Sequence, residues 1–351
     1  MGVGTILGRA LVAVTVAVVP LAVVATPGAV GTAAGAVCPG QTLNIPPASA
    51  NPTFSYPFGI VADASGNIIV SDASTNSIHK FDSSGTQTME IPATAATPNL
   101  SDPLGLGLDS SGNIYVVNRS NSNVVKFDPT GHQLMTISKT AATPNLFEPV
   151  GLAVDGAGNI YVGDEGTSTV YRFNSSGTQT LAIPASAATP NFGDPDGIAV
   201  DAAGNIYVAN YVGNVVQKFD SSGNQIMSIP ASAATPAMSG PEGVAVDPLG
   251  NIYVGTQDGH AVYQFSASGT QQFAITSAQA NPAFAAPVGV ALDPSANLYV
   301  ADKYNSNVYR FCTGVVLSTT TTTTAGGATT TTTSSAVAPA SAVAVEPSFT
   351  G

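Results

Sequence analysis

The chain has 351 residues, of which only 9% are charged, and its formal net charge is −12. Ordinary soluble domains carry roughly 25% charged residues, so this composition excludes charged helical bundles and charge-rich disordered chains. The Lys and Arg residues number 9 and form no cluster. Because a protein that binds a polyanion needs clustered cations to release counterions, the sequence predicts no binding of nucleic acid.

Residues 1–36 are typical of a secretory signal peptide. Arg9 precedes an apolar run at 10–25, and the tripeptide at 34–36 (AGA) fits the small-residue cleavage pattern. The run contains Pro20 and is short for a membrane span, which needs ~20 residues. We therefore expect a secreted, extracellular protein with no transmembrane span in its mature chain.

The composition changes at residue 317, where a threonine-rich segment begins. Threonine runs at 319–324 and 329–333 are surrounded by small residues and Pro. Such a segment buries little apolar surface, so residues 317–351 are expected to form a disordered stalk. The last six residues, 346–351 (EPSFTG), faintly resemble a cell-wall sorting signal. Attachment to the cell wall and a free stalk both stay open.

Internal repeats with a period of 46 residues occupy the middle of the chain. A Pro-x-Gly triplet recurs, an Asp follows four residues after its Gly, and a Phe closes the third segment of each copy. The triplets stand at 57–59, 103–105, 149–151, 195–197, 241–243 and 287–289; the Asp residues are Asp63, Asp109, Asp155, Asp201, Asp247 and Asp293; the Phe residues are Phe81, Phe127, Phe173, Phe219, Phe265 and Phe311. Six copies in one register are a strong signal of a repeat architecture.

Each copy contains four short segments rich in Ile, Val, Tyr and Phe that are separated by turn residues. In the fourth copy they are 197–201 (GIAVD), 205–210 (NIYVAN), 214–220 (NVVQKFD) and 225–230 (QIMSIP). Segments of this composition between tight Gly-containing turns predict β-strands. A repeat of this length with four strands is typical of a propeller blade. We therefore predict an all-β fold, a six-bladed β-propeller of four-stranded antiparallel blades, spanning residues 37–316.

The two ends of the repeat region are complementary. Residues 41–46 (QTLNIP) match a fourth strand such as 179–184 (QTLAIP), while the last copy stops after its third strand at Phe311. An N-terminal strand is therefore predicted to complete the last blade. In repeat register Cys38 and Cys312 fall two residues apart across one turn. We predict that they form a disulfide, which an extracytoplasmic compartment preserves.

The blades resemble NHL repeats, and the sixth copy at 300–311 (VADKYNSNVYRF) is the most similar. The resemblance covers residues 41–311. It implies a propeller fold, and it includes extracellular sensors, interaction modules and enzymes such as streptogramin lyases and amidating lyases. Because a fold does not determine function, the resemblance leaves these classes open. We expect a monomer.

Candidate functional residues lie where the copies differ from one another. The six repeated Asp residues of the first hairpin are interpreted as turn caps, because an Asp at the start of a tight turn accepts backbone N–H bonds. The opposite face gathers acidic residues in the third to fifth copies, offset by Arg119 and Lys303. The candidates for the ligand face are Asp164, Glu165, Asp194, Asp196, Glu242 and Asp302.

Two interpretations of this acidic face stay open. Asp196 and Glu242 occupy the position between Pro and Gly, which is apolar in the other four copies. They are candidates to hold a hard cation such as Ca²⁺ or to bind a cationic ligand, or else they form a solvated acidic rim. His260 is the one histidine on this face and is the weak candidate for a catalytic base.

The regularity of the blades favours a non-catalytic function. We expect an extracellular interaction propeller that presents this face to a protein, a glycan or a cell-wall component and requires no cofactor. The alternative is a metal-dependent lyase or a lactonase-like hydrolase that uses an acidic channel mouth.

Overall fold

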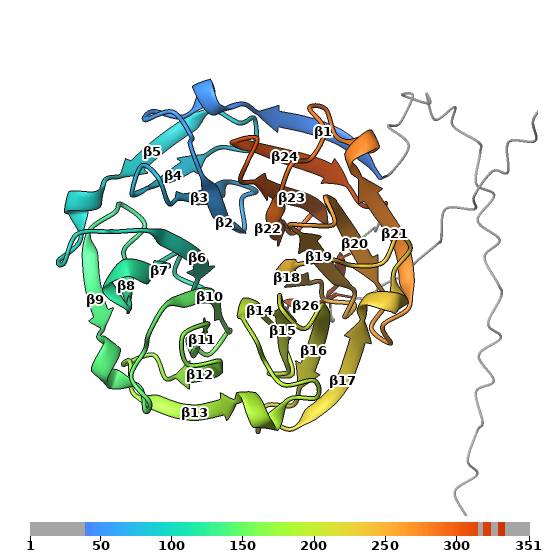
Figure 1. The fold of residues 1–351 in the computed structure, drawn as a ribbon. Helices are drawn as coiled ribbons and strands as arrows, with labels where there is room; N and C mark the ends of the chain where they lie inside the picture. The colour runs from blue at the N-terminus through green and yellow to red at the C-terminus, as the bar shows by residue number, and fades with distance from the viewer. Residues whose placement is uncertain (1–38, 315–318, 324–328, 334–351) are drawn as a thin grey trace, which may run out of the picture. The chain divides into compact units, whose positions relative to one another are not determined.

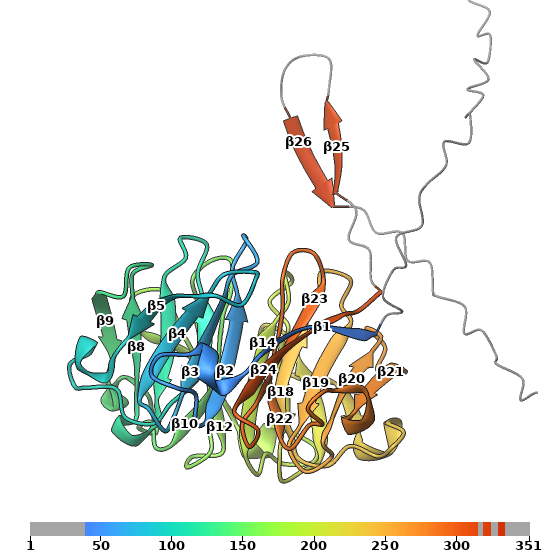
Figure 2. The ribbon, with the colours of Figure 1, turned by 90° about the horizontal axis from the view of Figure 1, so that it is seen from above.

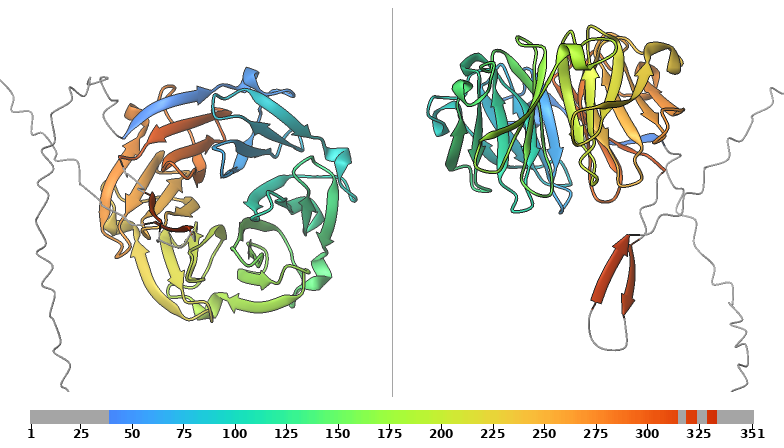
Figure 3. Two further views of the ribbon diagram at one scale, coloured as in Figure 1. Left: turned by 180° about the vertical axis from the view of Figure 1, so that it is seen from behind. Right: turned by 90° about the horizontal axis from the view of Figure 1, so that it is seen from below.

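The computed structural model describes residues 39–314, 319–323 and 329–333. Residues 40–312 form six four-stranded antiparallel sheets, arranged around one centre as the blades of a β-propeller (Figures 1 and 3). From the channel outward, the first strands are β2 (Pro57–Ala62), β6 (Pro103–Leu108), β10 (Pro149–Val154), β14 (Pro195–Val200), β18 (Pro241–Val246) and β22 (Pro287–Leu292). The second are β3 (Ile68–Asp72), β7 (Ile114–Asn118), β11 (Ile160–Asp164), β15 (Ile206–Asn210), β19 (Ile252–Thr256) and β23 (Asn297–Asp302).

The third strands are β4 (Ser77–Phe81), β8 (Asn123–Phe127), β12 (Thr169–Phe173), β16 (Val215–Phe219), β20 (Ala261–Phe265) and β24 (Asn307–Cys312). The outer strands are β5 (Gln87–Ile91), β9 (Gln133–Ile137), β13 (Gln179–Pro184), β17 (Gln225–Pro230), β21 (Gln271–Thr276) and β1 (Gly40–Ile45). Single 3-10 turns lie at Pro47–Ser49, Ala93–Ala95, Arg119–Asn121, Lys139–Ala141, Ala185–Ala187, Ala231–Ala233 and Ser277–Gln279. The predicted all-β six-bladed fold is confirmed.

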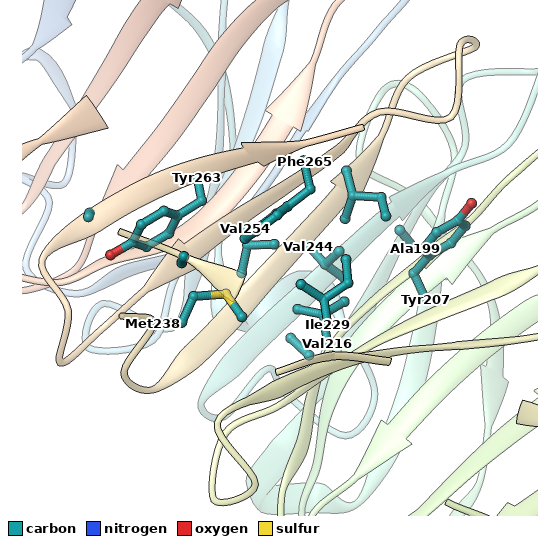
Figure 4. Close-up of a cluster of buried hydrophobic side chains, with 13 residues drawn as sticks. Ala199, Tyr207, Val216, Ile229, Met238, Val244, Val254, Tyr263 and Phe265 are labelled. Carbon is teal, nitrogen blue, oxygen red and sulfur yellow. The ribbon is translucent and has the colours of Figure 1, made fainter. Parts of the chain in front are cut away.

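Apolar side chains from neighbouring blades form the core. Between the fourth and fifth blades, Tyr207 and Val216 pack in one cluster with Val244, Val254 and Phe265 (Figure 4). The Phe that closes each third strand is fully buried in all six blades. The apolar side chains of the strands therefore form a set of cores that join each blade to the next.

The N-terminal strand closes the ring as the sequence predicted. β1 pairs antiparallel with β24, and the two strands lie side by side in Figures 1 and 2. Its register places Gln41 opposite Phe311, which matches Gln179 opposite Phe173 in the third blade. Gly40 lies opposite Cys312. Cys38 is outside the described residues, so the disulfide with Cys312 stays a prediction.

A glutamine at the start of each outer strand holds the loop of the preceding blade. In the fourth blade, Gln225 accepts a hydrogen bond from the N–H of Thr189 (2.6 Å) and donates to its carbonyl (2.9 Å). Gln41 of β1 makes the same two bonds with Asn281, so the closing strand is held in the same way. The near-identical loops at 95–99, 141–145 and 187–191 (AATPN) are each held by such a glutamine through the N–H of their threonine.

The glycine of each Pro-x-Gly triplet allows adjacent first strands to approach closely. A Cβ on Gly151 would overlap the carbonyl oxygen of Asp196, and one on Gly197 would overlap that of Glu242. The same relation closes the ring from Gly289 to Phe58. The triplet is thus a packing requirement, repeated six times, that fixes the first strands around the channel.

Only residues 319–323 and 329–333 of the threonine-rich tail are described, and the disordered stalk expected for residues 317–351 stays a prediction. Its two threonine runs pair as an antiparallel hairpin of β25 (Thr319–Thr323) and β26 (Thr329–Thr333). The branched Cβ of threonine favours extended backbone, which the composition argument neglected. Residues 1–36, the rest of the tail and their domain boundaries lie outside the described residues. Within those residues, no helix is long and apolar enough to cross a membrane.

Candidate ligand site at the channel mouth

Three repeat positions surround one mouth of the central channel, and we call them the mouth positions. They are the residue before each Pro-x-Gly, the residue inside it, and the residue after each second strand. In blade order they are Tyr56, Asp102, Glu148, Asp194, Gly240 and Ala286; Phe58, Leu104, Val150, Asp196, Glu242 and Val288; and Ala73, Arg119, Glu165, Tyr211, Gln257 and Lys303. In every blade the backbone N–H of the third residue donates to the carbonyl of the first. The backbone is therefore constant while the side chains differ.

The last residue of each second strand braces the loop beneath these positions. Asp302 accepts hydrogen bonds from the N–H groups of Ala285 (2.9 Å) and Ala286 (2.6 Å). Asp164 accepts from the N–H of Phe147 and from both donors of Thr167. Both carboxylates are fully buried. Their oxygens are therefore engaged by their own loops, and the ligand-face role of Asp164 and Asp302 stays a prediction.

The opposite face, where a hairpin turn joins the first and second strands of each blade, is called the hairpin face. The same Asp residue accepts hydrogen bonds in each of these turns, as in the fourth blade. Asp201 accepts from the N–H groups of Ala203 and Asn205, and from the side-chain N–H of Asn205. Tyr207 also donates to it. These donors lower the pKa of Asp201 although its burial acts in the opposite sense. The turn-cap interpretation of the six repeated Asp residues agrees with this geometry.

Arg119 links carboxylates of the second and third blades. Its guanidinium lies 2.7 Å from Glu165, 3.5 Å from Glu148 and 3.7 Å from Asp102. Burial opposes the positive charge, but the carboxylates outweigh it and raise the pKa of Arg119. Glu165 thus has a cationic partner within the chain.

Lys303 occupies a buried corner between the fifth, sixth and first blades. Its ammonium lies 3.0 Å from the Glu242 carboxylate. It also lies over the rings of Tyr56, Phe58 and Tyr304, 5.4–5.5 Å from their centroids, which is cation–π distance. Lys303 is 6% exposed and Glu242 is 8% exposed. Burial raises the pKa of Glu242, and Lys303 opposes that rise in part.

Asp196 lies between these two ion-pair groups, and within the described part of the chain no cation forms an ion pair with it. It is 5% exposed, and its Oδ1 has no hydrogen-bond partner. Burial raises the pKa of Asp196 well above its usual range, and the charges of Glu242, Glu165 and Asp194 raise it further. A hydrogen bond to Glu165 also favours the protonated form. Its burial and the neighbouring carboxylates therefore both disfavour the ionised form of Asp196.

Two cavities meet at this mouth. One of about 340 Å³ follows the channel along the six first strands and includes Asp196 and Glu242 in its lining. The other, of about 370 Å³, lies beside it between Tyr56, Phe58, Arg119, Glu165 and Lys303. Glu242 and Phe58 line both. The mouth thus offers a ligand an apolar channel, an aromatic corner and a set of carboxylates.

His260 does not join this group. It lies in the loop between β19 and β20 with a left-handed backbone (φ 46°), and its side chain is exposed. No contact joins its ring to Asp196 or Glu242 among the described residues. Within the same residues there is no group of three or more His, Cys, Asp or Glu side chains placed to hold a metal. The paired metal ligands Asp196 and Glu242 and the catalytic role of His260 stay predictions.

The sequence predicted that Glu165, Asp194, Asp196 and Glu242 lie on this face, and the structure brings them to one mouth. Arg119 and Lys303 were expected only to offset the acidic charge, whereas both form ion pairs with these carboxylates. The sequence analysis also missed the aromatic corner of Tyr56, Phe58 and Tyr304. Comparison of the copies could have revealed the charged partners, because Arg119, Glu165 and Lys303 occupy one repeat position.

The fold and this site define a six-bladed β-propeller with a charged, partly aromatic channel mouth. Residues 185–242 match the family model described as the SMP-30/Gluconolactonase/LRE-like region. Residues 224–263 match the model of the strictosidine synthase-like N-terminal region. No curated protein sequence matches the chain. The match to NHL repeats stays a prediction.

Solved structures with the same fold belong to several functional classes. A gluconolactonase from Xanthomonas campestris is 18% identical, with a TM-score of 0.57, over 74% of this chain and 86% of that one. A catalytically inactive virginiamycin B lyase from Staphylococcus aureus with quinupristin is 17% identical, with a TM-score of 0.54, over 73% and 84%. A chain of the nidogen/laminin complex is 17% identical, with a TM-score of 0.55, over 68% and 85%. At these identities the likeness concerns the fold alone.

Proposed function

We propose that the protein is an extracellular binding propeller, and that its channel mouth is the surface that binds a protein, a glycan or a cell-wall component. One observation carries this proposal. The repeats keep the same backbone hydrogen bonds and the same glutamine at the start of each outer strand, yet they place different charged and aromatic side chains at the mouth positions. A fold that needed only stability would be served by the apolar residues that Val150 and Val288 provide.

Secretion is part of this proposal. The apolar segment at 10–25 and the cleavage pattern at 34–36 support it. The register of β1 also supports the Cys38–Cys312 bridge, because Gly40 lies opposite Cys312 only two residues after Cys38. Such a bridge would join the two ends of the propeller outside the cytoplasm.

A metal-dependent lyase or lactonase-like hydrolase is the second candidate. The partial family match and the gluconolactonase and lyase structures favour it. Against it stand the exposed position of His260 and the buried ion pair, in which Glu242 already has the Lys303 ammonium as its partner. Ca²⁺ between Asp196 and Glu242 belongs to this candidate.

The first test compares two truncations of exposed side chains. The full chain is screened on arrays of glycans, peptidoglycan fragments and peptides beside Tyr304→Ala at the mouth and Leu134→Ala on outer strand β9. Tyr304 and Leu134 are 60% and 55% exposed, so both variants should fold. A ligand lost with Tyr304→Ala and kept with Leu134→Ala supports the proposal. A ligand that both variants retain, or that Leu134→Ala loses, contradicts it.

The second test separates the two candidates. Thermal unfolding of the full chain is followed with millimolar Ca²⁺ and then with chelator. A ligand that binds only the folded state stabilises it by about 2.7 kcal/mol at 100 times its Kd. A rise in Tm that disappears in the double variant Asp196→Asn/Glu242→Gln would favour the metal-dependent enzyme over the binding propeller.

A further inference from the structure

Among the described residues, the ion pairs around the mouth leave the buried carboxyl of Asp196 without a cation. Arg119 forms an ion pair with Glu165, and Lys303 forms one with Glu242. Asp196 stands next to both carboxylates, is 5% exposed, lines the channel cavity, and has an oxygen without a hydrogen-bond partner. An isolated buried carboxyl of this kind destabilises a fold unless a partner compensates it.

The fold itself does not require an acid here. The equivalent residues of the other blades include Leu104, Val150 and Val288, and each supports the same backbone hydrogen bonds. Residues that break a local rule without a structural gain are characteristic of functional sites. Asp196 is therefore best explained by a group that arrives from outside.

On the basis of the proposed function, we propose that the mouth binds a basic side chain, Lys or Arg, presented by a protein partner, and that Asp196 is the residue that receives its charge. The incoming cation pairs with the buried Asp196 carboxyl from the channel cavity, where its Oδ1 has no hydrogen-bond partner. It completes a series of alternating charges that already runs from Asp102 through Arg119 to Glu165.

The rim indicates a macromolecular partner rather than a small ion. Phe147, Val212 and Tyr304 are each 60% exposed, and each is one residue away from a mouth position. They come from the third, fourth and sixth blades. Exposed aromatic and aliphatic side chains around a charged centre are the arrangement by which a protein interface surrounds a buried anchor residue. A partner surface lying on these three side chains would deliver its basic residue to Asp196.

Binding should be linked to a proton. The groups that face Asp196 are the carboxyls of Glu165, Glu242 and Asp194, and each of them raises its pKa. They keep its pKa raised while no cation is present, and a bound cation reverses that effect. The complex contains ionised Asp196, so the proton must leave when the partner binds. Affinity should therefore fall as the pH falls below the raised pKa, by at most tenfold per pH unit.

The experiment measures binding of hexalysine and hexaarginine to the full chain at physiological salt, with hexaglutamine as the neutral probe. Asp196→Asn should weaken binding of both basic peptides at least tenfold and abolish its pH dependence. Glu90→Gln is the matched control, since it removes one charge from an exposed site on outer strand β5, and it should change affinity less than twofold. Asp196→Val, which copies Val150 and Val288, guards against misfolding, and its Tm should equal or exceed that of the wild type.

Several results would overturn the proposal. Equal losses in Asp196→Asn and Glu90→Gln would mean bulk attraction to an acidic protein. Ethylammonium binding as tightly as the peptides would mean a site for small amines. No binding of either basic peptide, together with a glycan or an acidic peptide that Tyr304→Ala no longer binds, would refute the basic partner and leave the proposed function intact.

Discussion

The channel mouth and the outer edge of the propeller follow opposite rules. At the outer edge, the same glutamine of all six blades accepts a hydrogen bond from a backbone N–H of the neighbouring loop, and in five of them it also donates to the carbonyl of that residue, as Gln225 does with Thr189. At the mouth, one backbone frame presents Arg119, Glu165 and Lys303 from equivalent positions. The uniform outer edge therefore holds the ring together, including its closing strand, whereas the side chains at the mouth can differ without changing the backbone.

The largest expected effect breaks the uniform frame next to the mouth. Gly151→Ala places a Cβ against the carbonyl oxygen of Asp196, so two first strands must separate. We expect a loss of about 4 kcal/mol or more, since overpacking at a backbone contact leaves no side chain to yield. Urea unfolding measures it. Gly156→Ala, where a Cβ meets nothing within 4 Å, should change stability by less than about 1 kcal/mol; equal losses would contradict the argument.

The next effect tests whether the buried ion pair at the mouth is needed for stability. Glu242→Gln leaves the buried Lys303 ammonium without its carboxylate and should cost about 3 kcal/mol. The double variant Glu242→Val/Lys303→Ala introduces the residues found at Val288 and Ala73, and it should recover stability to within about 1 kcal/mol of the wild type. Chemical unfolding of the three proteins provides the comparison. A double variant as unstable as the single one would make the pair a structural requirement.

The sequence predicted what repetition determines. The period, the strand order, the closing strand β1 and its register opposite β24 all came from matching one copy to another. What it could not predict depends on contacts between blades. The partners of Arg119 lie on two blades, and the rings around Lys303 lie on the first and sixth, which only ring closure brings together. The threonine hairpin was missed because burial was weighed and β-propensity was not.

A smaller effect tests the uniform outer edge. Gln225→Ala removes both bonds to Thr189, and we expect a loss of about 1–2 kcal/mol. Ile226→Thr is the neighbouring control, because Ile226 is exposed and the first and third blades already carry Thr88 and Thr180 there. It should change stability by less than about 0.5 kcal/mol. Thermal unfolding of both variants shows whether the two hydrogen bonds of Gln225 stabilise the outer edge of the propeller.

The smallest effect has opposite signs at the mouth and at the hairpin face. The folded state raises the pKa of Asp196, so the wild type loses stability as the pH rises through that raised value. Asp196→Asn should match the wild type below about pH 4 and exceed it by about 1 kcal/mol at neutral pH. Asp128 in the turn between β8 and β9 behaves conversely, because hydrogen bonds from Thr130 and His132 lower its pKa to about 2.

For Asp128→Asn, the wild type should therefore be the more stable protein above about pH 4, and the difference should close as the pH falls toward 2. Unfolding free energies of the three proteins across this range give both signs in one experiment. If Asp196→Asn showed the same sign as Asp128→Asn, the mouth carboxyl would be a satisfied structural group like the turn caps. The mouth carboxyl would then not differ from the hairpin-turn carboxyl in its effect on stability.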